Sequence, residues 1–453
     1  MNIIIAGDGK VGATLTKQLS NEGHEVTIID SNPDVLEHTA QRFDIMTVSG
    51  NCTLLPVLAE AGVEKADLLI AATSKDEINL LCALTAHNSN PKLHTIARIR
   101  DPQFREQIYK MRDVLGISLM VNPEYSAAKE IERLLKYPAF LKRDTFAKGR
   151  IEIVELKIGH DSILKDVTLI NLYSIVKCSV LVCTVIRNGK VFIPGGDFVL
   201  RENDKIYVTA PSQELTLLLK NLGIITKKIK NIMIAGGGKV SVYLAKLLEK
   251  SNISVTIVEQ DEKRCEYLAG VLNKADIIHG DASNQQVLLE EGLEDCDALI
   301  SLTGIDELNM VISLYGNSCG VEKIITKLGR VDDNAVIDSL PIGSTISPKR
   351  ICCSQIERYV RAMENQVGAA ITVHLFADGN AEALEFRVDD STKYCDIPLK
   401  KLKLKKHILL ASISKSGQII IPNGDSFFSV GDTIVIVSDG DVAVNKLNDI
   451  FDE

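Results

Sequence analysis

The chain has 453 residues, of which 45% are hydrophobic and 25% are charged, and its formal net charge at pH 7 is -9. This length predicts about three or four domains of ordinary size, and the balanced composition excludes general disorder. The acidic excess argues against nucleic acid as the main partner, because proteins bind that polyanion by neutralising its phosphates with basic residues.

Targeting, membrane and metal signals are weak throughout the chain. No basic segment precedes the apolar run at 3–6, so the start of the sequence does not predict a signal peptide. No apolar run approaches the ~18 residues that a membrane-spanning helix needs. The ten cysteines form no CxxC pair and show no zinc-like spacing with histidine. We therefore expect a cytoplasmic protein with free thiols and no metal site.

Short apolar strands alternate with helical stretches through the first 120 or so residues. Strands are expected at 3–6, 26–30, 45–48, 68–72 and 95–99, with a helix over 11–21. This alternation is typical of a doubly wound parallel sheet. A connecting helix is expected over 125–135. From about residue 150 to 222 the pattern changes to short strands with hairpin turns such as Asn188-Gly189, which predicts a small α+β module.

The second half of the chain repeats this design. Gly7 recurs as Gly236 and Asp30 as Glu259, each 229 residues later, since 236 minus 7 and 259 minus 30 are both 229. An offset held across both halves indicates a tandem duplication. The sequence thus predicts an α/β protein of two tandem units, each a Rossmann subdomain followed by a small α+β module. The expected boundaries are 1–136, 140–225, 229–352 and 365–453.

A glycine-rich motif opens the first half. Gly7, Gly9 and Gly12 follow a strand and begin a helix, and Asp30 ends the next strand. In such a fingerprint the first glycine makes the turn and the second admits the pyrophosphate, while the third lets the helix pack closely. The carboxylate binds ribose hydroxyls and repels a 2′-phosphate, so NAD is favoured over NADP.

The second copy departs from this pattern at one position. Ser241 replaces the third glycine after Gly236 and Gly238, while Glu259 keeps the carboxylate. A serine is small enough for the helix to pack with slight widening. The alternatives left open here are NAD, another adenine nucleotide such as ATP or ADP, or weak binding.

Polar residues at the ends of later strands are further candidates, because doubly wound sheets bind ligands at this edge. They are Asn51-Cys52, Thr73-Ser74 and Arg98 in the first half, and Asp281-Ala282, Thr303-Gly304 and Lys327 in the second. Arg98 has two interpretations, contact with a diphosphate or a surface ion pair.

One pair of residues favours an enzyme. Tyr125 and Lys129 have the Tyr-x-x-x-Lys spacing of short-chain dehydrogenases, but Arg112 stands where those enzymes carry serine, and the second copy lacks the pair. An accidental i, i+4 pair on a helix is the better interpretation. We therefore expect a binding protein and no catalytic residue, with a soluble NAD-dependent oxidoreductase as the alternative.

The pattern as a whole resembles the TrkA family, the cytosolic NAD-binding subunits of bacterial Trk potassium-uptake systems, which are built from two tandem regulator-of-potassium-conductance (RCK) units. The resemblance rests on Gly7 to Gly12, Asp30, Gly50-Asn51, the segment 72–79 and Arg98, on Pro194 to Asp197 in the small module, and on the duplication of this set. It covers the whole chain. Asn51 and Ser241 depart from the family pattern, and both bear on nucleotide preference.

The resemblance implies two NAD sites and a membrane partner. The first site would be lined by Gly7, Asp8, Gly9, Lys10, Val11, Asp30, Asn51, Cys52, Thr73, Ser74 and Arg98, and the second by Gly236, Gly237, Gly238, Lys239, Val240, Glu259, Asp281, Ala282 and Thr303. It also implies a dimer or tetramer at the inner face of the cell membrane, bound to the Trk pore subunit. The same type of regulator serving another cation transporter is a further alternative.

Overall fold

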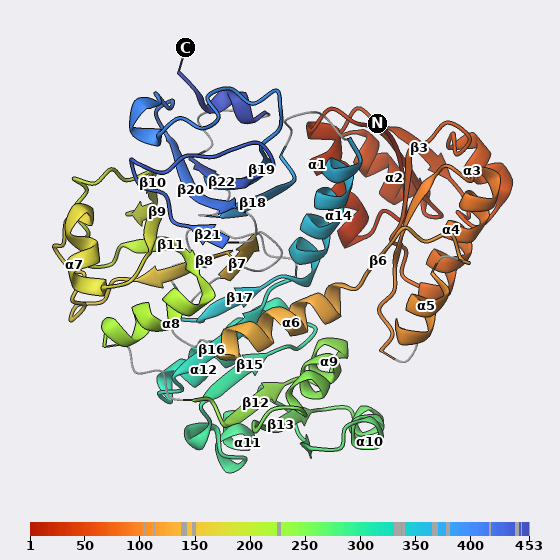
Figure 1. The fold of residues 1–453 in the computed structure, drawn as a ribbon. Helices are drawn as coiled ribbons and strands as arrows, with labels where there is room; N and C mark the ends of the chain where they lie inside the picture. The colour runs from red at the N-terminus through yellow and green to blue at the C-terminus, as the bar shows by residue number, and fades with distance from the viewer. Residues whose placement is uncertain are drawn as a thin grey trace. The chain divides into compact units, whose positions relative to one another are not determined.

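The computed structural model describes residues 1–102, 105–112, 114–136, 143–146, 151–223, 228–329, 337, 340–364, 370–376, 381–415, 418–439, 444 and 446–452. The subdomain boundaries expected at 140, 225 and 365 lie outside these residues. The elements are drawn in chain order in Figure 1, from red at the N-terminus to blue at the C-terminus.

The first half begins with a six-stranded parallel sheet in the order β3-β2-β1-β4-β5-β6. Residues 3–5 and 68–71 are almost fully buried, as expected for central strands covered on both faces by helices (Figure 1). The strands are β1 Asn2–Ala6, β2 Glu25–Asp30, β3 Met46–Ser49, β4 Leu68–Ala71, β5 His94–Arg98 and β6 Leu119–Val121. The helices are α1 Lys10–Asn21, α2 Pro33–Ala40, α3 Leu55–Glu60, α4 Asp76–Ser89, α5 Arg105–Met111 and α6 Pro123–Lys136.

The second half begins with a sheet of the same topology, in the order β14-β13-β12-β15-β16-β17. Its strands are β12 Asn231–Ala235, β13 Ser254–Glu259, β14 Ala275–His279, β15 Ala298–Ser301, β16 Lys323–Lys327 and β17 Ser344–Ile346. Its helices are α9 Lys239–Leu248, α10 Glu262–Val271, α11 Gln285–Glu290, α12 Asp306–Ser318 and α14 Pro348–Glu364. Both orders are those of a Rossmann fold, in which the strand order reverses beside the first strand.

Each parallel sheet is followed by a five-stranded sheet whose pairings are antiparallel. The first contains β7 Arg143–Phe146, β8 Ile151–Lys157, β9 Leu181–Arg187, β10 Lys190–Phe192 and β11 Lys205–Pro211, with α7 Leu172–Val176 and α8 Ser212–Asn221. The second contains β18 Thr372–Phe376, β19 Ala381–Arg387, β20 Ile408–Lys415, β21 Gln418–Ile420 and β22 Thr433–Ser438. The predicted fold class, two tandem units of a Rossmann subdomain and a small α+β module, is confirmed.

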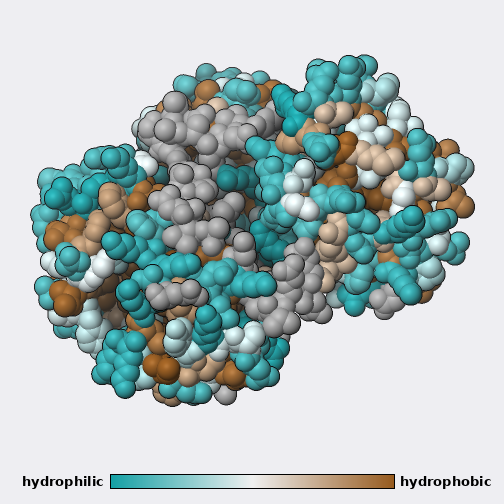
Figure 2. Space-filling model, turned by 90° about the horizontal axis from the view of Figure 1, so that it is seen from above, coloured by the Kyte–Doolittle hydropathy of each residue, from teal (hydrophilic) through white to brown (hydrophobic). Residues whose placement is uncertain are grey.

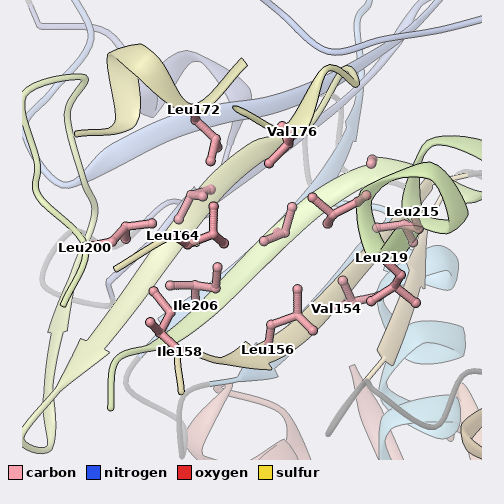
Figure 3. Close-up of a cluster of buried hydrophobic side chains, with 14 of the residues drawn as sticks. Val154, Leu156, Ile158, Leu164, Leu172, Val176, Leu200, Ile206, Leu215 and Leu219 are labelled. Atoms are coloured by element: carbon pink, nitrogen blue, oxygen red, sulfur yellow. The ribbon is translucent and has the colours of Figure 1, made fainter. Parts of the chain in front are cut away.

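The core of the first small module lies between its sheet and its helices. Alternate side chains of its strands point toward α7 and α8, and apolar residues of the two helices close the layer (Figure 3). The labelled members are Val154, Leu156, Ile158, Leu164, Leu172, Val176, Leu200, Ile206, Leu215 and Leu219. The turn at Asn188-Gly189 has the expected hairpin geometry, with φ of 52° and 74° at its two residues.

The chain divides into two compact units that do not follow its two halves. One unit contains both parallel sheets, and the other contains both antiparallel sheets. Within the first unit, the Nδ2 atom of Asn122 donates to the Oη atom of Tyr243 at 2.8 Å, and Ser126 on α6 hydrogen-bonds to Gln355 on α14. These contacts join the two Rossmann folds of one chain through the start of α6, through α9 and through α14.

Within the second unit, the two small modules share a buried cluster. Tyr207 on β11 lies in it with Ala383 on β19 and Val437 on β22. The remaining buried members are Ile153, Cys183, Ala381, Ala411 and Val435. Burial of apolar surface therefore holds the two small modules together.

One face of the molecule can be described by its hydropathy. Hydrophilic side chains dominate the face shown in Figure 2, and hydrophobic ones form small separate groups. Among the residues that the structure describes, no helix combines the length and the apolar composition needed to cross a bilayer. All ten cysteines lie in described segments and all are free thiols, as predicted.

Candidate functional site

In the glycine loop of the first Rossmann fold, backbone atoms of the loop pack closely against backbone atoms of neighbouring segments. Gly7 has φ of +102°, and a Cβ atom there would lie 2.9 Å from the Cα atom of Thr73. A Cβ atom at Gly12 would collide with the carbonyl oxygen of Gly7. Gly9 is the extended N-cap of α1, so the first free amides of the helix emerge at the carboxyl edge of the sheet. Such a helix start attracts phosphate groups.

Asp30 is fixed beside this loop by two backbone amides. Its Oδ2 atom accepts from the amide of Asp8 at 2.7 Å, and its Oδ1 atom accepts from the amide of Asn32 at 2.9 Å. Each carboxylate oxygen has a second lone pair that these bonds leave free. The carboxylate is thereby fixed beside the glycine loop with lone pairs free for further donors, so these residues could hold the ribose hydroxyls of an adenosine dinucleotide.

Asp8 points away from the place expected for a ligand. Its side chain is buried, and its Oδ2 atom accepts from the hydroxyl of Thr39 on α2 at 2.6 Å. Burial raises the pKa of the Asp8 carboxyl, and the nearby charge of Asp30 adds to this, while the Thr39 bond opposes it. Asp8 therefore contributes to the site through its amide and its charge.

On the other side of the loop, a buried asparagine joins the ends of β4 and β5. The Oδ1 atom of Asn79 accepts from the amide of Thr73 at 2.8 Å and from its hydroxyl at 2.7 Å. The Nδ2 atom of Asn79 donates to the carbonyl oxygen of Arg98 at 2.8 Å. Two predicted site residues, Thr73 and Arg98, are thus held together by one side chain that sequence reasoning did not single out as functional.

Two arginines lie at this edge. Arg98 donates through Nη2 to the carbonyl oxygen of Thr73 at 2.9 Å, and Arg100 donates to that of Ser74. Asp76 receives the amides of Arg100 and Asp101, both at 2.8 Å, and so fixes the start of the segment after β5. Burial lowers the pKa of Arg98, because it removes water from around the cation. An anionic ligand group beside Arg98 would compensate for that loss. Arg100 was missed, although its position two residues after Arg98 marks the same strand end.

The second site reproduces the carboxylate geometry. Gly236 has φ of +99°, and a Cβ atom there would lie 3.1 Å from the Cα atom of Thr303. Glu259 accepts from the amide of Gly237 at 2.6 Å and from that of Asp261 at 2.9 Å. Ser241, in place of the third glycine, donates its hydroxyl to the carbonyl oxygen of Gly236 at 2.6 Å. The serine is accommodated by a hydrogen bond to the loop itself.

The arrangement in which one buried asparagine bonds to two neighbouring strand ends, here called the strand-end clamp, is also duplicated. Asn309 accepts from the amide of Thr303 at 2.8 Å and donates to the carbonyl oxygen of Lys327 at 3.0 Å. Lys327 takes the place of Arg98 and donates to the carbonyl oxygen of Leu302 at 3.2 Å. The repeat of Asn79 as Asn309 was the signal that could have identified both residues as parts of the site.

Other predicted residues contribute backbone or lie in the core. Cys52 and Ala282 are buried among apolar side chains, so a ligand could meet only their backbone atoms. Asn51 is exposed and accepts from the amide of Thr53. Asp281 accepts from the amide of Ser283 at 2.8 Å, and the backbone and hydroxyl bonds of Ser283 lower its pKa.

The side chains at the start of each helix after the glycine loop likewise divide into buried core residues and accessible ones. The valines that follow the loop lysines are buried, whereas Lys10 is exposed and Lys239 is half-buried. The two valines, Val11 and Val240, therefore belong to the core under each helix. The lysines at the helix starts remain available to an anionic ligand.

Charged groups of the two sites act on one another within the unit that holds both parallel sheets. Burial lowers the pKa of Lys327, and Lys10 of the first glycine loop lowers it further. Burial raises the pKa of Glu124 on α6, against the opposing charges of Arg100, Arg98 and Lys239. Charged residues of both sites therefore act on Glu124, a residue that sequence reasoning missed because these charges come from both halves of the chain.

The pair that favoured an enzyme has a structural explanation. The ring of Tyr125 packs edge-on against that of Tyr243, with centroids 5.4 Å apart. The Nζ atom of Lys129 lies 5.5 Å from the Tyr125 ring centroid. The two residues thus belong to the contact between the two Rossmann folds. In the part of the chain that the structure describes, no group of three or more histidine, cysteine or acidic side chains could hold a metal ion.

Fold and site together define a protein with two Rossmann folds, each carrying a glycine loop and an oriented carboxylate, and each followed by a small module. The family model described as the TrkA-N domain matches residues 3–123 and 232–348, and that described as the TrkA-C domain matches 153–223 and 383–451. The chain belongs to the TrkA family. This membership agrees with the prediction of a regulatory protein rather than an enzyme.

Individual proteins resemble the chain over its full length. It is 29% identical over 451 residues to a Trk system potassium uptake protein TrkA homolog of Archaeoglobus fulgidus, covering 100% of both chains. It is 29% identical to the Trk system potassium uptake protein TrkA of Haemophilus influenzae, covering 100% of this chain and 98% of that one.

Solved structures share the fold. The crystal structure of the GsuK RCK domain superposes with a TM-score of 0.61 at 18% identity, over 97% of this chain and 92% of that one. The structure described as the GsuK channel bound to NAD superposes with a TM-score of 0.61 at 17% identity, over 97% and 77%. The tandem RCK architecture is therefore shared with structures that are only 17% and 18% identical in sequence to this chain.

Proposed function

We propose that this protein binds NAD(H) in both Rossmann folds and regulates potassium uptake as the cytoplasmic subunit of a Trk-type transporter. The observation that carries the proposal is the matched geometry of Asp30 and Glu259, each held by two amides beside a glycine loop, in a chain of the TrkA family. The TrkA proteins to which it is similar are named as parts of Trk potassium-uptake systems.

The groups around each carboxylate suit a dinucleotide. The helix start after Gly9 and the free amides there would hold the pyrophosphate, and Asp30 would accept bonds from the adenosine ribose hydroxyls. Arg98 and Arg100 lie where strand ends offer positive charge to phosphate oxygens. A GsuK structure described as bound to NAD, and another as bound to ADP, support adenine nucleotides as the ligand class.

The geometry of the second site supports NAD(H) binding less strongly than that of the first. Ser241 uses its hydroxyl on the loop carbonyl of Gly236, so the loop there is held differently from the first. ATP or ADP is the alternative occupant of this site. The first site, with all three glycines, is the one that we assign to NAD(H).

Regulation would follow from occupancy of the two sites. A ligand shifts a conformational equilibrium only as far as its affinity differs between the two states. Phosphates placed near Arg98, Arg100 or Lys239 would change the charge balance around Glu124, which both sites share. We propose that this change alters the contact between the Rossmann folds and is transmitted, in a dimer or tetramer at the inner membrane face, to the Trk pore subunit.

The test is recovery of the partner. The tagged full chain is used to capture proteins from detergent-solubilised membranes of its own cell, with and without NADH, followed by mass spectrometry. A Trk-type pore is the expected partner. Capture of another cation transporter would keep the regulator and change the ion. Failure to recover any membrane protein, together with substrate-dependent oxidation of NADH, would favour the oxidoreductase alternative instead.

A further inference from the structure

The loop after the third strand of each parallel sheet carries a different polar side chain in the two sites. In the first sheet, the amide of the glycine after β3 donates to the carbonyl oxygen of Asp30 at 2.9 Å, so the next residue, Asn51, lies close to the end of β2. In the second sheet, the glycine after β14 makes the same bond to Glu259 at 2.9 Å, and Asp281 takes the place of Asn51. Both side chains are exposed at the carboxyl edge of their sheet.

The hydrogen bonds of Asn51 leave its N–H donors free. Its Oδ1 atom accepts from the amide of Thr53 at 3.1 Å and from the Thr53 hydroxyl at 2.9 Å. Because a backbone amide can only donate, this bond determines which end of the Asn51 side chain is the oxygen. The Nδ2 group makes no hydrogen bond to any residue that the structure describes. The first site therefore offers two N–H donors to a ligand at this position.

The equivalent position of the second site offers acceptors alone. The Oδ1 atom of Asp281 accepts from the amide of Ser283 at 2.8 Å. The backbone and hydroxyl bonds of Ser283 lower the pKa of this carboxyl, so the group is ionised at neutral pH. An ionised carboxylate has about four lone pairs and no donor. A ligand at Asp281 therefore meets a negatively charged acceptor, where a ligand at Asn51 meets a donor.

The order of the strands indicates which part of a nucleotide reaches these two residues. The glycine loop follows the first strand of each sheet and is assigned above to the phosphates, and the carboxylate that ends the second strand is assigned to the ribose. The third strand is the next one along, on the side away from the first. A nucleotide that lies across these strand ends therefore places its base at the third. Purines differ there in position 6, because the amino group of adenine donates and a 6-oxo group accepts.

We infer that the second site selects adenine over a 6-oxopurine through Asp281, and that the first site accepts both bases through Asn51. The Asp281 carboxylate attracts the N–H groups of the 6-amino substituent and repels an oxygen in their place. The Asn51 amide can donate to a ring nitrogen of adenine or to the 6-oxo oxygen of hypoxanthine, so exchange of the base changes less. The inference rests on the proposed function, since it requires that both Rossmann folds bind purine nucleotides.

The experiment is isothermal titration calorimetry of the full chain with NADH and with reduced nicotinamide hypoxanthine dinucleotide, in which a 6-oxo group replaces the 6-amino group. Asp30→Ala leaves the second site to be measured, and Glu259→Ala leaves the first. We expect the hypoxanthine analogue to bind at least about tenfold more weakly than NADH at the second site, and within about threefold of NADH at the first. If the second site takes ADP in place of NADH, the pair ADP and IDP makes the same comparison.

Exchange of the two residues tests their role directly. In the Asp30→Ala background, Asp281→Asn should bring the two affinities within about threefold of each other. In the Glu259→Ala background, Asn51→Asp should weaken binding of the analogue about tenfold relative to NADH. Asp276→Asn removes an exposed carboxylate near the start of β14, at the other end of that strand. It is the matched control for the change in charge and should leave the preference of the second site unaltered.

The outcomes separate the inference from the function beneath it. Equal discrimination at the two sites of the parent chain, or a preference that does not follow the exchanged residue, would overturn the selectivity while leaving nucleotide binding in place. Absence of both NADH and ADP binding at both sites of the unmodified chain would instead refute the proposed function, and the inference with it. Circular dichroism and thermal unfolding of each variant identify a loss of folding.

Discussion

Asp30 and Glu259 occupy equivalent positions in the two halves and are held by the same two hydrogen bonds. Each accepts from the amide of the residue after the first glycine of its loop and from the amide two residues further along its own chain. Glutamate is one methylene longer than aspartate, yet both carboxylates reach the loop. The duplication has thus preserved the position of the charge while changing the residues around it.

The third position of the glycine motif should tolerate substitution differently in the two loops. In Gly12→Ala the new Cβ atom would collide with the carbonyl oxygen of Gly7, so we expect a loss of about 2 kcal/mol or more in the free energy of unfolding. Nucleotide binding at the first site should fall with it. Ser241→Gly should lose about 1 kcal/mol, because only one hydrogen bond to Gly236 is removed.

Urea denaturation and calorimetric titration measure these effects. Ser241→Gly is the control for changes at a helix start that leave the loop free of collision. A Gly12→Ala variant as stable as the parent would show that the loop can move aside without penalty.

Removal of the strand-end clamp should affect both folding and binding. Asn79 is fully buried and bonds to Thr73 and to Arg98. We expect Asn79→Ala to lower the free energy of unfolding by about 2–4 kcal/mol, because buried backbone groups lose their partners. Exposed Asn51 is a matched control, and Asn51→Ala should change stability by less than about 1 kcal/mol. Equal effects of the two substitutions in urea denaturation would refute the clamp.

The buried carboxyl of Asp8 should make stability depend on pH. Its pKa is raised above 3.8 by burial, so the native state holds this proton more tightly than the unfolded state does. The contribution of the group to stability therefore falls as pH rises from about 4 through the native pKa. Asp8→Asn cannot ionise but can still accept from Thr39. The stability of Asp8→Asn relative to the parent should thus increase between about pH 4 and pH 7. A difference that is constant with pH, in urea denaturation at several pH values, would contradict the effect.

The contact between the two small modules contains a buried polar pair that can be tested directly. The hydroxyl of Tyr207 donates to the buried Oε2 atom of Glu155 at 2.6 Å, while the Tyr207 ring lies in the shared cluster. Tyr207→Phe should lower the free energy of unfolding by about 1–3 kcal/mol, because the carboxylate loses a donor. Tyr173→Phe changes a tyrosine that is 69% exposed and should have no measurable effect on thermal unfolding. Similar melting temperatures for both variants would argue against the pair.

Sequence reasoning located the strands and both glycine loops because their signals are local. Five strands of the first sheet were predicted within one residue at each end, and Asp30 was identified by its distance from Gly7. The roles of Arg100 and Glu124 depend on contacts between strand ends and between the two halves of the chain. Spacing along the sequence carries no information on which way such side chains point. Cys52 is a different case. The sequence placed it correctly at a strand end, but it did not reveal that its side chain lies in the core.

The most direct test of the central proposal is potassium flux through the Trk pore of the same cell, reconstituted in liposomes with this protein. NADH should change the flux in the presence of the unmodified chain. The double variant Asp30→Ala, Glu259→Ala should still bind the pore and give a flux that does not respond to NADH. An unchanged flux with the unmodified chain, or an equal NADH response with the double variant, would contradict nucleotide control through these two carboxylates.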